Sequence, residues 1–494
     1  MRMRSIFICI FMLFFYESFS QKKVLELTLS DVVDHYSLQS PAARVEHLNY
    51  QNIVLEYANY KKGFLPSISF TLNPMNFNRS LKLLQSPEDG NYSYVEDYSN
   101  ASSVGLNISQ KIGLTGGNIN IGTNLSLLDE YSRDYQTFSA SPFYINYSQD
   151  LWGGRKQLRL ERKIRDNRNL ISVKQYCLKL AEIQERSVEL YLAVLSEKLL
   201  VEFSMQNISV NDTLRHISKI KLENGDITSY DYKQIELQML DTQYTYQQAL
   251  KRYKEAVRDL TNYLKVDADS ISINIPQLEL PLLLETSVVE HHVKRNNPSL
   301  LEEHTKLQEA ELDLLNAKLE TRINGNISLN FGLNQYAESL SMVYQNANQR
   351  QSLNITFRIP VYQWGVNRNK QRIANNNYKI KQFVIENSIR EFSNDIKKHI
   401  DRYNHSVCLW QLAEASCRLS HEQYMIAVKA FTLGELSVYE LTSARQKQND
   451  SIKQYYVAIK DTYISYFHLR SLSLYDFQTE QDLEDVFTNI QELN

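Results

Sequence analysis

Pairs of carboxylate residues follow two glycines that interrupt long helical patterns. The stretches LENGDITSYDY and FTLGELSVYEL share the order glycine, acid, apolar residue, hydroxyl residue and, after a tyrosine, a second acid. The residues concerned are Gly225, Asp226 and Asp231 in the first stretch, and Gly434, Glu435 and Glu440 in the second. Glycine adopts left-handed dihedral angles at little cost, so each glycine is predicted to end a helix. The acids can then stabilise the start of the next helix through its dipole, or present negative charge to cations.

The sequence lacks the short motifs that signal common enzymatic chemistry. It has no Gly-x-x-x-x-Gly-Lys-Ser/Thr loop, no His-Glu-x-x-His motif and no Gly-x-Ser-x-Gly motif. The ten histidines are scattered, and the adjacent His291 and His292 are expected on a helix surface, since neighbouring residues do not share a helix face. Eight methionines do not support a thioether path for copper. We therefore predict no enzymatic activity, no cofactor and no metal, and the net charge of -3 gives no basic surface for nucleic acid.

The N-terminus has the three parts of a secretory signal peptide. Arg2 and Arg4 precede an apolar run, and Ser18-Phe19-Ser20 forms a small-x-small cleavage site, so Gln21 is the expected mature start. An uncleaved anchor is the alternative. No later run of 18 apolar residues is present, so no transmembrane helix is expected. The protein is therefore predicted to be exported.

The cysteines that remain after cleavage do not suggest a disulfide framework. They are odd in number and lie in helical pattern: Cys177, Cys408 and Cys417. We expect them to be buried as small apolar residues.

Glycine and proline are scarce, which favours long helices. The chain has 14 Gly and 9 Pro, and neither type occurs in 155–224, 366–433 or 435–494. Apolar residues recur there in steps of three and four, as in the seam of a coiled coil. This predicted seam consists of Ile385, Ile389, Phe392, Ile396, Ile400, Tyr403, Val407 and Trp410.

Six other segments alternate apolar and polar residues with the period of a β-strand. They lie near 66–73, 104–109, 119–125, 143–148, 327–333 and 353–359. Their polar positions are nearly all Ser, Thr, Asn and Gly, whereas a sheet exposed to water usually carries Lys and Glu. A membrane barrel, with its apolar face toward lipid and its polar face toward the lumen, fits this pattern. A soluble, half-buried sheet is the alternative.

The two halves of the chain repeat one another. Val32-Val33-Asp34-His35 matches Val288-Val289-Glu290-His291, and the strand-to-helix corner QDLWGG matches IPVYQWG. The order helix, helix, strands, helix, helix is predicted twice. The corner residues are Trp152, Gly153 and Gly154 in the first half, and Tyr362 and Gly365 in the second.

These features together resemble the TolC family of outer-membrane efflux and secretion proteins. The resemblance rests on the steps Ser40-Pro41 and Asn297-Pro298, the strand opening LPS at 65–67, both corners and both glycine turns. It implies a mixed α and β membrane protein, in which a trimer shares one antiparallel β-barrel and one coiled-coil α-helical barrel. The expected organisation is a signal peptide at 1–20, a first repeat at 21–270 with strands about 65–151, a second repeat at 271–475 with strands about 323–361, and a C-terminal extension at 476–494.

The resemblance also implies a function and partners. The chain would be the exit duct of a tripartite efflux or type I secretion system, in the outer membrane of a diderm bacterium with a periplasmic helical part. Its partners would be two further copies, outer-membrane lipid, a periplasmic adaptor docking at Gly225 and Gly434, and an inner-membrane transporter. An exported coiled-coil scaffold or adhesin without a pore is the alternative.

Within the family, acids on the helix after each glycine turn ring the closed periplasmic entrance. Asp231 and Glu440 match that position, with Asp226 and Glu435 as further candidates. Phe431 and Leu436 stand where the family has its latching Tyr and Arg.

The first repeat departs from the family in another way. It holds four strand candidates where the family usually has two, with QKIGLTGGNINI at 110–121 as an added turn and hairpin. The added pair could widen the barrel from 12 to 18 strands or fold at its base.

Overall fold

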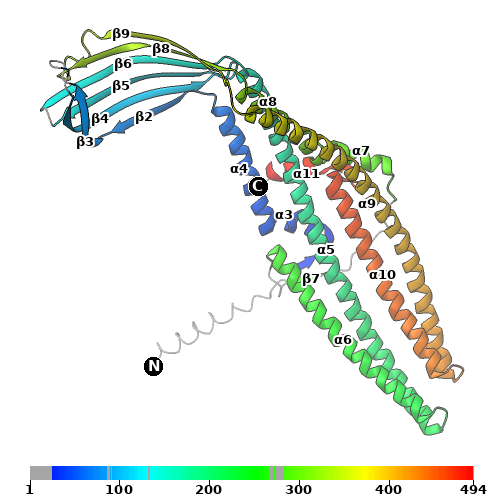
Figure 1. The fold of residues 1–494 in the computed structure, drawn as a ribbon. Coiled ribbons are helices and arrows are strands. Elements are labelled where there is room, and N and C mark those ends of the chain that lie inside the picture. The colour runs from blue at the N-terminus through cyan, green and yellow to red at the C-terminus, as the bar shows by residue number, and fades with distance from the viewer. Residues whose placement is uncertain are drawn as a thin grey trace, which may run out of the picture. The chain divides into compact units, whose positions relative to one another are not determined.

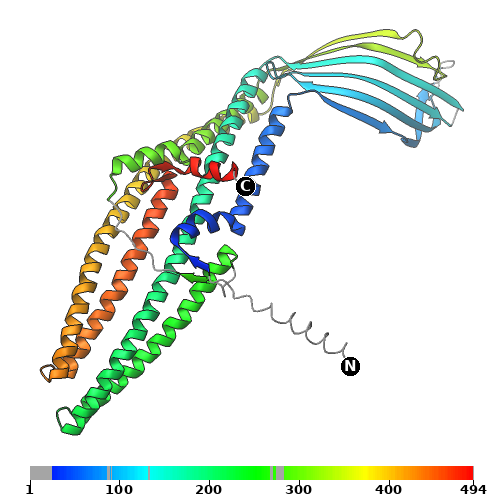
Figure 2. The ribbon, with the colours of Figure 1, turned by 180° about the vertical axis from the view of Figure 1, so that it is seen from behind.

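The computed structural model describes residues 25–85, 90, 92–131, 134–266, 271–273 and 283–492. The expected signal peptide and the mature start at Gln21 lie outside these residues. Figures 1 and 2 show long helices and one curved sheet.

The chain forms two compact units, each of which combines segments from both halves of the sequence. The helical unit contains the described parts of Met1–Tyr50, Val173–Pro298 and Arg390–Asn494. The sheet unit contains those of Gln51–Ser172 and Ser299–Ile389. The boundaries of the compact units therefore differ from those of the sequence repeats.

The helical unit is built on two antiparallel helix pairs. The pairs are α5 (Gly154–Asn224) with α6 (Ser229–Leu264), and α9 (Val366–Leu433) with α10 (Val438–Ser473). Figures 1 and 2 show the α5–α6 and α9–α10 connections at the same end of this unit.

Shorter elements complete the helical unit. They are β1 (Leu25–Leu27), α2 (Leu29–Asp31), η1 (Val32–Tyr36), α3 (Ser37–Gln39), the start of α4 (Pro41–Lys62), β7 (Ile271–Ile273), α7 (Thr286–Asn296), β10 (Tyr475–Asp476), β11 (Gln481–Asp482) and α11 (Leu483–Glu492). β1 pairs in parallel with β7, so the stretches that precede the first helices of the two repeats lie side by side. No pattern in the sequence predicted this pairing.

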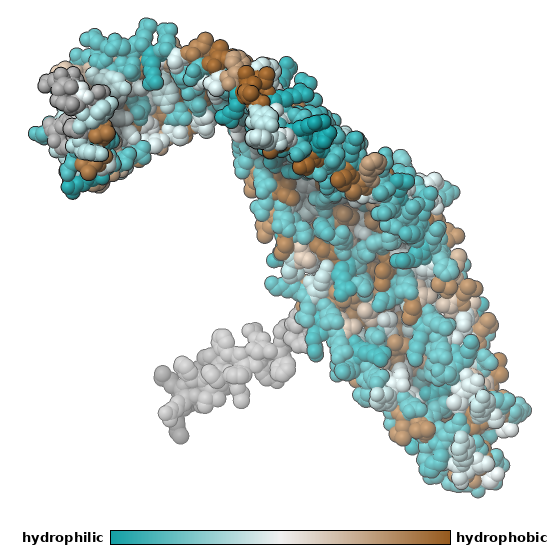
Figure 3. All heavy atoms as spheres, in the orientation of Figure 1, coloured by the Kyte–Doolittle hydropathy of each residue, from teal (hydrophilic) through white to brown (hydrophobic). Residues whose placement is uncertain are grey.

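Most of the predicted coiled-coil seam is buried. Tyr403, Val407 and Trp410 pack in a core that also holds Tyr191 of α5. Phe392 is only partly buried, and Ile389 is exposed. On the face of the helical unit that Figure 3 shows, separate hydrophobic residues interrupt a mainly hydrophilic surface.

Two expectations about single residues were wrong. Cys177 is buried and burial raises its pKa to about 12, but Cys408 is exposed and Cys417 is only partly buried. His292 does not lie free on a helix surface: its ring stacks on Tyr475 with centroids 3.7 Å apart, since α7 packs against the C-terminal strands.

The sheet unit contains one seven-stranded antiparallel sheet. Its path is β2-β4-β5-β6-β8-β9, and β3 also pairs with β4. The strands are β2 (Ser67–Asn73), β3 (Phe77–Gln85), β4 (Tyr92–Lys111), β5 (Asn118–Glu130), β6 (Tyr135–Asp150), β8 (Asn324–Ala337) and β9 (Asn348–Arg358). The end of α4, the starts of α5 and α9, and α8 (Ser299–Glu320) join this sheet unit.

The sheet contains all six alternating segments found in the sequence, but it is larger than they indicated. β3 was not expected, and β4 is 20 residues long although only six of them carried the clear alternation. Fold class is confirmed as long paired helices with one antiparallel sheet.

Candidate functional site

The register of the sheet gathers apolar residues on one face. Ile68 lies opposite Ile108, Ile108 opposite Ile121, Ile121 opposite Ile145, and Ile145 opposite Phe331. Residues directly opposite one another in antiparallel strands point to the same side, so this row continues across the strands. Ile68 and Phe331 are both exposed, at 69% and 47%. A face this apolar normally requires a cover of protein or lipid.

The opposite face is polar over the same span. Asn120 lies opposite Asn146, Asn146 opposite Asn330, and Asn330 opposite Ser352. These side chains also bond across strands: the Asn330 amide donates to Ser352 Oγ at 3.1 Å. A face of this composition suits contact with a water-filled lumen.

Aromatic side chains gather where the strands meet the helices. Trp152 packs against Phe357 with ring centroids 6.1 Å apart, and Tyr362 meets Trp364 edge-on at 4.8 Å. Trp152, Tyr362 and Trp364 are all exposed. Tryptophan and tyrosine in such a belt are typical of a membrane–water interface.

The corner glycines start the long helices. Gly153 and Gly365 have φ of +85° and +82°. Their carbonyls accept the first helical hydrogen bonds, from Gln157 N–H at 2.9 Å and Asn369 N–H at 3.0 Å. Gly154 is the first residue of α5. The residue before each corner glycine is a tryptophan, so Trp364 is the counterpart of Trp152, a match that the sequence analysis assigned to Tyr362.

Both helix-ending glycines form the same hydrogen-bonded turn. Gly225 and Gly434 have φ of +82° and +84°. Asp226 N–H donates to Lys221 C=O at 2.8 Å, and Glu435 N–H to Ala430 C=O at 3.0 Å. With the bonds from the glycine N–H groups, these are Schellman ends, which left-handed glycine permits.

Asp231 and Glu440 hold the starts of α6 and α10. Asp231 Oδ2 accepts hydrogen bonds from Thr228 N–H at 3.2 Å and Thr228 Oγ at 2.7 Å. Glu440 Oε2 accepts from Ser437 in the same way, at 3.0 and 2.7 Å. These bonds hold the pKa of Glu440 below its ordinary value. Each is therefore half of a capping box.

A third capping box shows that this arrangement has no necessary link to an entrance. Thr28 and Asp31 form it at α2, away from both glycine turns in the sequence. Helix capping by itself thus explains the positions of Asp231 and Glu440. Their role at an entrance stays a prediction. Asp226 and Glu435 are exposed beside the glycines, and their service at an entrance is likewise a prediction.

The predicted apolar pair near the turn is divided between core and surface. Phe431 is fully buried in a cluster with Leu214, Ile235 and Tyr424, whereas Leu436 is partly buried against that cluster. Lys221 Nζ donates to Phe431 C=O at 2.7 Å and so joins the end of α5 to the end of α9.

The search of family models and the search of curated proteins found no match. Solved structures do match. The Campylobacter jejuni CmeC outer membrane channel aligns with a TM-score of 0.66 at 15% identity, covering 96% of this chain and 93% of that one. The outer membrane protein VceC from Vibrio cholerae gives 0.65 at 11%, covering 90% and 96%. The open state of the Neisseria gonorrhoeae MtrE outer membrane channel gives 0.60 at 12%, covering 92% and 93%.

The chain has the TolC fold. The agreement extends over nearly the whole described chain, helices and strands together. The sequence resemblance is thus confirmed at the level of fold.

This TolC fold contains a buried arginine that the sequence analysis missed. Arg445 of α10 is 8% exposed, and it lies on the stripe between Leu441 and Ile452 that faces the core. Its Nη2 donates to Thr242 Oγ of α6 at 2.5 Å, and its Nη1 lies 3.4 Å from Asn211 Oδ1 of α5. The available signal was a charged residue on a stripe whose spacing predicts burial.

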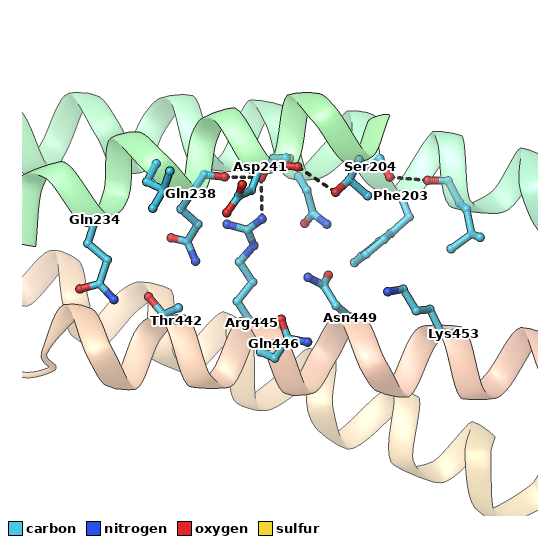
Figure 4. A pocket seen from close by; sticks show the side chains of 15 residues that line it. Phe203, Ser204, Gln234, Gln238, Asp241, Thr442, Arg445, Gln446, Asn449 and Lys453 are labelled. Atoms are coloured by element: carbon cyan, nitrogen blue, oxygen red, sulfur yellow. Dashed lines mark hydrogen bonds between the residues drawn. The ribbon is translucent and has the colours of Figure 1, made fainter. Parts of the chain in front are cut away.

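Arg445 lies beside a polar cavity between the helix pairs. Figure 4 shows the side chain reaching from α10 toward α6, with Gln238 and Asp241 nearby. The cavity has a volume of about 380 Å³, and Lys453 also lines it. Burial lowers the pKa of Arg445 from its ordinary value, and its Nε has no hydrogen-bond partner among the described residues. Thr242 Oγ also accepts from Asn211 Nδ2 at 2.7 Å, so three helices meet in one network.

Two other features are absent from the described residues. No helix there has the length and apolar character needed to cross a membrane. In the same part of the chain, no group of three or more His, Cys, Asp and Glu side chains is placed to hold a metal ion.

Proposed function

We propose that this chain is the outer-membrane channel of an export system and passes substrates from the periplasm to the exterior. The observation that carries the proposal is the sheet with one largely apolar face and one polar face on which Ser, Asn and Thr predominate. Lipid would cover the first and water would fill the space behind the second. An exported scaffold or adhesin has no need of such a sheet.

The proposal is tested with purified protein in planar bilayers and with a matched pair of variants. Ile355→Asp places a carboxylate on the apolar face, and Thr356→Asp places one on the polar face of the same strand. We expect Ile355→Asp to destabilise the membrane form by about 1–3 kcal/mol and Thr356→Asp to cost clearly less. Heat stability of the assembled protein in detergent measures the difference. Absence of discrete conductance steps from the parent, together with equal tolerance of both variants, would refute the channel.

Exposed heptad stripes support assembly from several copies. Leu412, Leu419 and Ile426 of α9 recur every seven residues and are between 60% and 68% exposed. On α6, Tyr230, Leu237 and Tyr244 show the same spacing. Apolar residues at this spacing form the seam of a coiled coil, so each stripe fits a helix of another copy. The proposed assembly is a homotrimer with cyclic symmetry.

We expect Leu419→Glu with Ile426→Glu to break this assembly, because charges would enter two successive layers of the seam. The measurement is mass in gentle detergent by multi-angle light scattering. Glu422→Gln, on the same helix, is the control and should leave the mass unchanged. A trimer that survives the double variant would mean that these stripes face water.

The two glycine turns are the proposed docking site for a periplasmic adaptor, which would connect the channel to an inner-membrane transporter. Asn224 and Leu433 are exposed beside the turns and are suitable positions for crosslinking cysteines. Their placement at one end of the helical unit supports a single docking surface.

We further propose that Asp231 and Glu440 form a negatively charged entrance. Capping fixes both carboxylates beside their turns, and threefold symmetry would bring six together. Such a ring attracts cations, and its effect weakens with salt, since screening acts over about 8–10 Å.

Asp231→Asn with Glu440→Gln is therefore expected to abolish cation preference in single-channel recordings. Gln retains much of the capping geometry at Glu440, which limits the structural effect there. Asp31→Asn serves as the control, because it alters the same motif at α2. Unchanged selectivity in the double variant would leave the two acids as helix caps alone.

A further inference from the structure

Two of the seven strands share one position in the sheet. β2 pairs with Ser103–Ser109 of β4, and β3 pairs with Tyr92–Asn100 of the same strand. The chain between them is Pro74 to Asn76, where Ala101 N–H donates to Asn76 C=O at 3.0 Å. β2 and β3 together thus form one interrupted strand along the same edge of β4. The sheet consequently has six strand positions: β2/β3, β4, β5, β6, β8 and β9.

The added hairpin of β4 and β5 is an integral part of the sheet. Its two strands pair without interruption from Ser99 with Glu130 to Lys111 with Asn118. Tyr144 of β6 crosses β5 at Gly122 and donates to Asn107 Oδ1 of β4 at 3.4 Å. A Cβ at Gly122 would lie 2.7 Å from the Tyr144 hydroxyl, so this crossing requires glycine.

The turn of this hairpin is fixed as well. Gln149 Nε2 donates to Thr115 C=O at 3.0 Å, and Gly116 packs against Gly154 at the start of α5. Lys111 Nζ lies 5.8 Å from the centre of the Phe64 ring. These contacts place the hairpin beside the other strands along its whole length.

The edges of the sheet favour closure with other copies. β2 and β9 end the path, and the side chains of both are exposed throughout. Unpaired backbone groups are not tolerated in lipid, and six strands are too few to close around their own side chains. With six antiparallel positions, β9 of one copy runs opposite to β2 of the next, so a closed ring of copies is antiparallel throughout.

We infer that the channel has an exit of 18 strands, which is three copies of six positions, and that this exit passes bulky polymers. The inference rests on the proposed function. For strands about 4.8 Å apart and tilted by about 40°, 18 strands give a backbone radius of about 18 Å. Four positions per copy would give 12 strands and about 12 Å. A helix with its side chains is about 10–12 Å wide, so the larger exit admits polypeptide with helical structure.

The first test compares the parent with a deletion of residues 77–130. The deletion removes β3, β4 and β5 and leaves β2 beside β6, to which it is already antiparallel. Neutral polyethylene glycols of graded size are added on the exit side during single-channel recording. We expect the largest polymer that enters the pore to be clearly smaller for the deletion variant. An equal size limit, with both proteins conducting, would overturn the inference and leave the channel intact.

A second measurement does not depend on the deletion variant folding. In a cysteine-free background, cysteines at Leu106 and Ile121 should react with a lipid-dissolved maleimide, and those at Asn107 and Asn120 with a water-soluble one. Reaction of all four with the water-soluble reagent would place the hairpin outside the wall.

The strand edges are tested by oxidative crosslinking. Ser67→Cys, Ser69→Cys and Thr71→Cys are each combined with Asn354→Cys, because the four residues lie on the polar face of the edge strands. We expect crosslinked dimers and trimers on denaturing gels. Crosslinks within single chains alone would mean that β2 and β9 close on each other, and no pore in bilayers would refute the proposed channel itself.

Discussion

Thr242→Val combined with Asn211→Leu should destabilise the helical unit by about 3–5 kcal/mol, because it leaves the buried Arg445 charge without acceptors. In the structure, Arg445 Nη2 donates to Thr242 and Nη1 faces Asn211, and its Nε has no hydrogen-bond partner in the part of the chain that is described. Removing both oxygen atoms would therefore leave the whole guanidinium buried between the helix pairs without its hydrogen-bond acceptors. Guanidinium-induced loss of helical circular dichroism measures the change.

The matched variant removes the Arg445 charge and leaves Asn211 and Thr242 unchanged. Arg445→Met keeps an apolar stem of similar length in the core, so its cost should be much smaller than that of the double variant. Adding Arg445→Met to the double variant should restore most of the lost stability. If Arg445→Met and the double variant were equally destabilising, the network would contribute packing without electrostatic specificity.

The same network bears on the proposed channel. Arg445 of α10 bonds to α5 and α6, so it ties the two helix pairs together near the glycine turns. We expect the double variant to open more often than the parent in bilayer recordings, since the helix pairs can then separate more easily.

Asp476→Ala should also cost about 3–5 kcal/mol, through a buried ion pair at the other end of α10. Arg470 Nε lies 2.7 Å from Asp476 Oδ2, and Arg470 Nη1 donates to Gln184 Oε1 at 2.7 Å. Tyr466 Oη donates to Asp476 Oδ1 at 2.8 Å. The variant would leave Arg470, which is 4% exposed, as an uncompensated buried charge.

The pH dependence of this pair has a definite sign. Burial alone would raise the pKa of Asp476, but Arg470 and the hydrogen bonds from Tyr466 and Gln478 outweigh burial and hold the pKa below its ordinary value. A lowered folded-state pKa gives stability that is complete above the unfolded pKa of about 3.9 and is lost as pH falls through the folded value. The contribution of this group to parent stability should therefore be complete and independent of pH between pH 5 and 7, and it should be lost below about pH 4, a loss that Asp476→Ala lacks.

An exposed ion pair provides the control for that experiment. Asp212 bonds to Arg215 on the surface of α5, with both side chains half exposed. Asp212→Ala should cost less than about 1 kcal/mol. A similar small loss for Asp476→Ala would show that water reaches the Arg470 pair in solution.

The sequence by itself determined the elements and much of the fold. Long stretches without glycine or proline predicted α5 and α9, and left-handed glycines were predicted at Gly225 and Gly434, where φ is indeed positive. Alternation of apolar and polar residues predicted the faces of the sheet. These signals are local, since helix period, strand period and glycine geometry each depend on neighbours along the chain.

Tertiary structure alone decided the pairing of distant segments. β3 shares one position in the sheet with β2 because both pair with the long β4. The local period of a sequence does not indicate which strand a segment will pair with. Arg445 gained its role because Asn211 and Thr242, more than 200 residues earlier, are brought against α10. For Asp231 and Glu440 the sequence supplied the residues and the structure supplied their capping bonds. Local composition sets which element forms, whereas contacts between distant residues set what that element can do, because their energies exist only once the chain has brought them together.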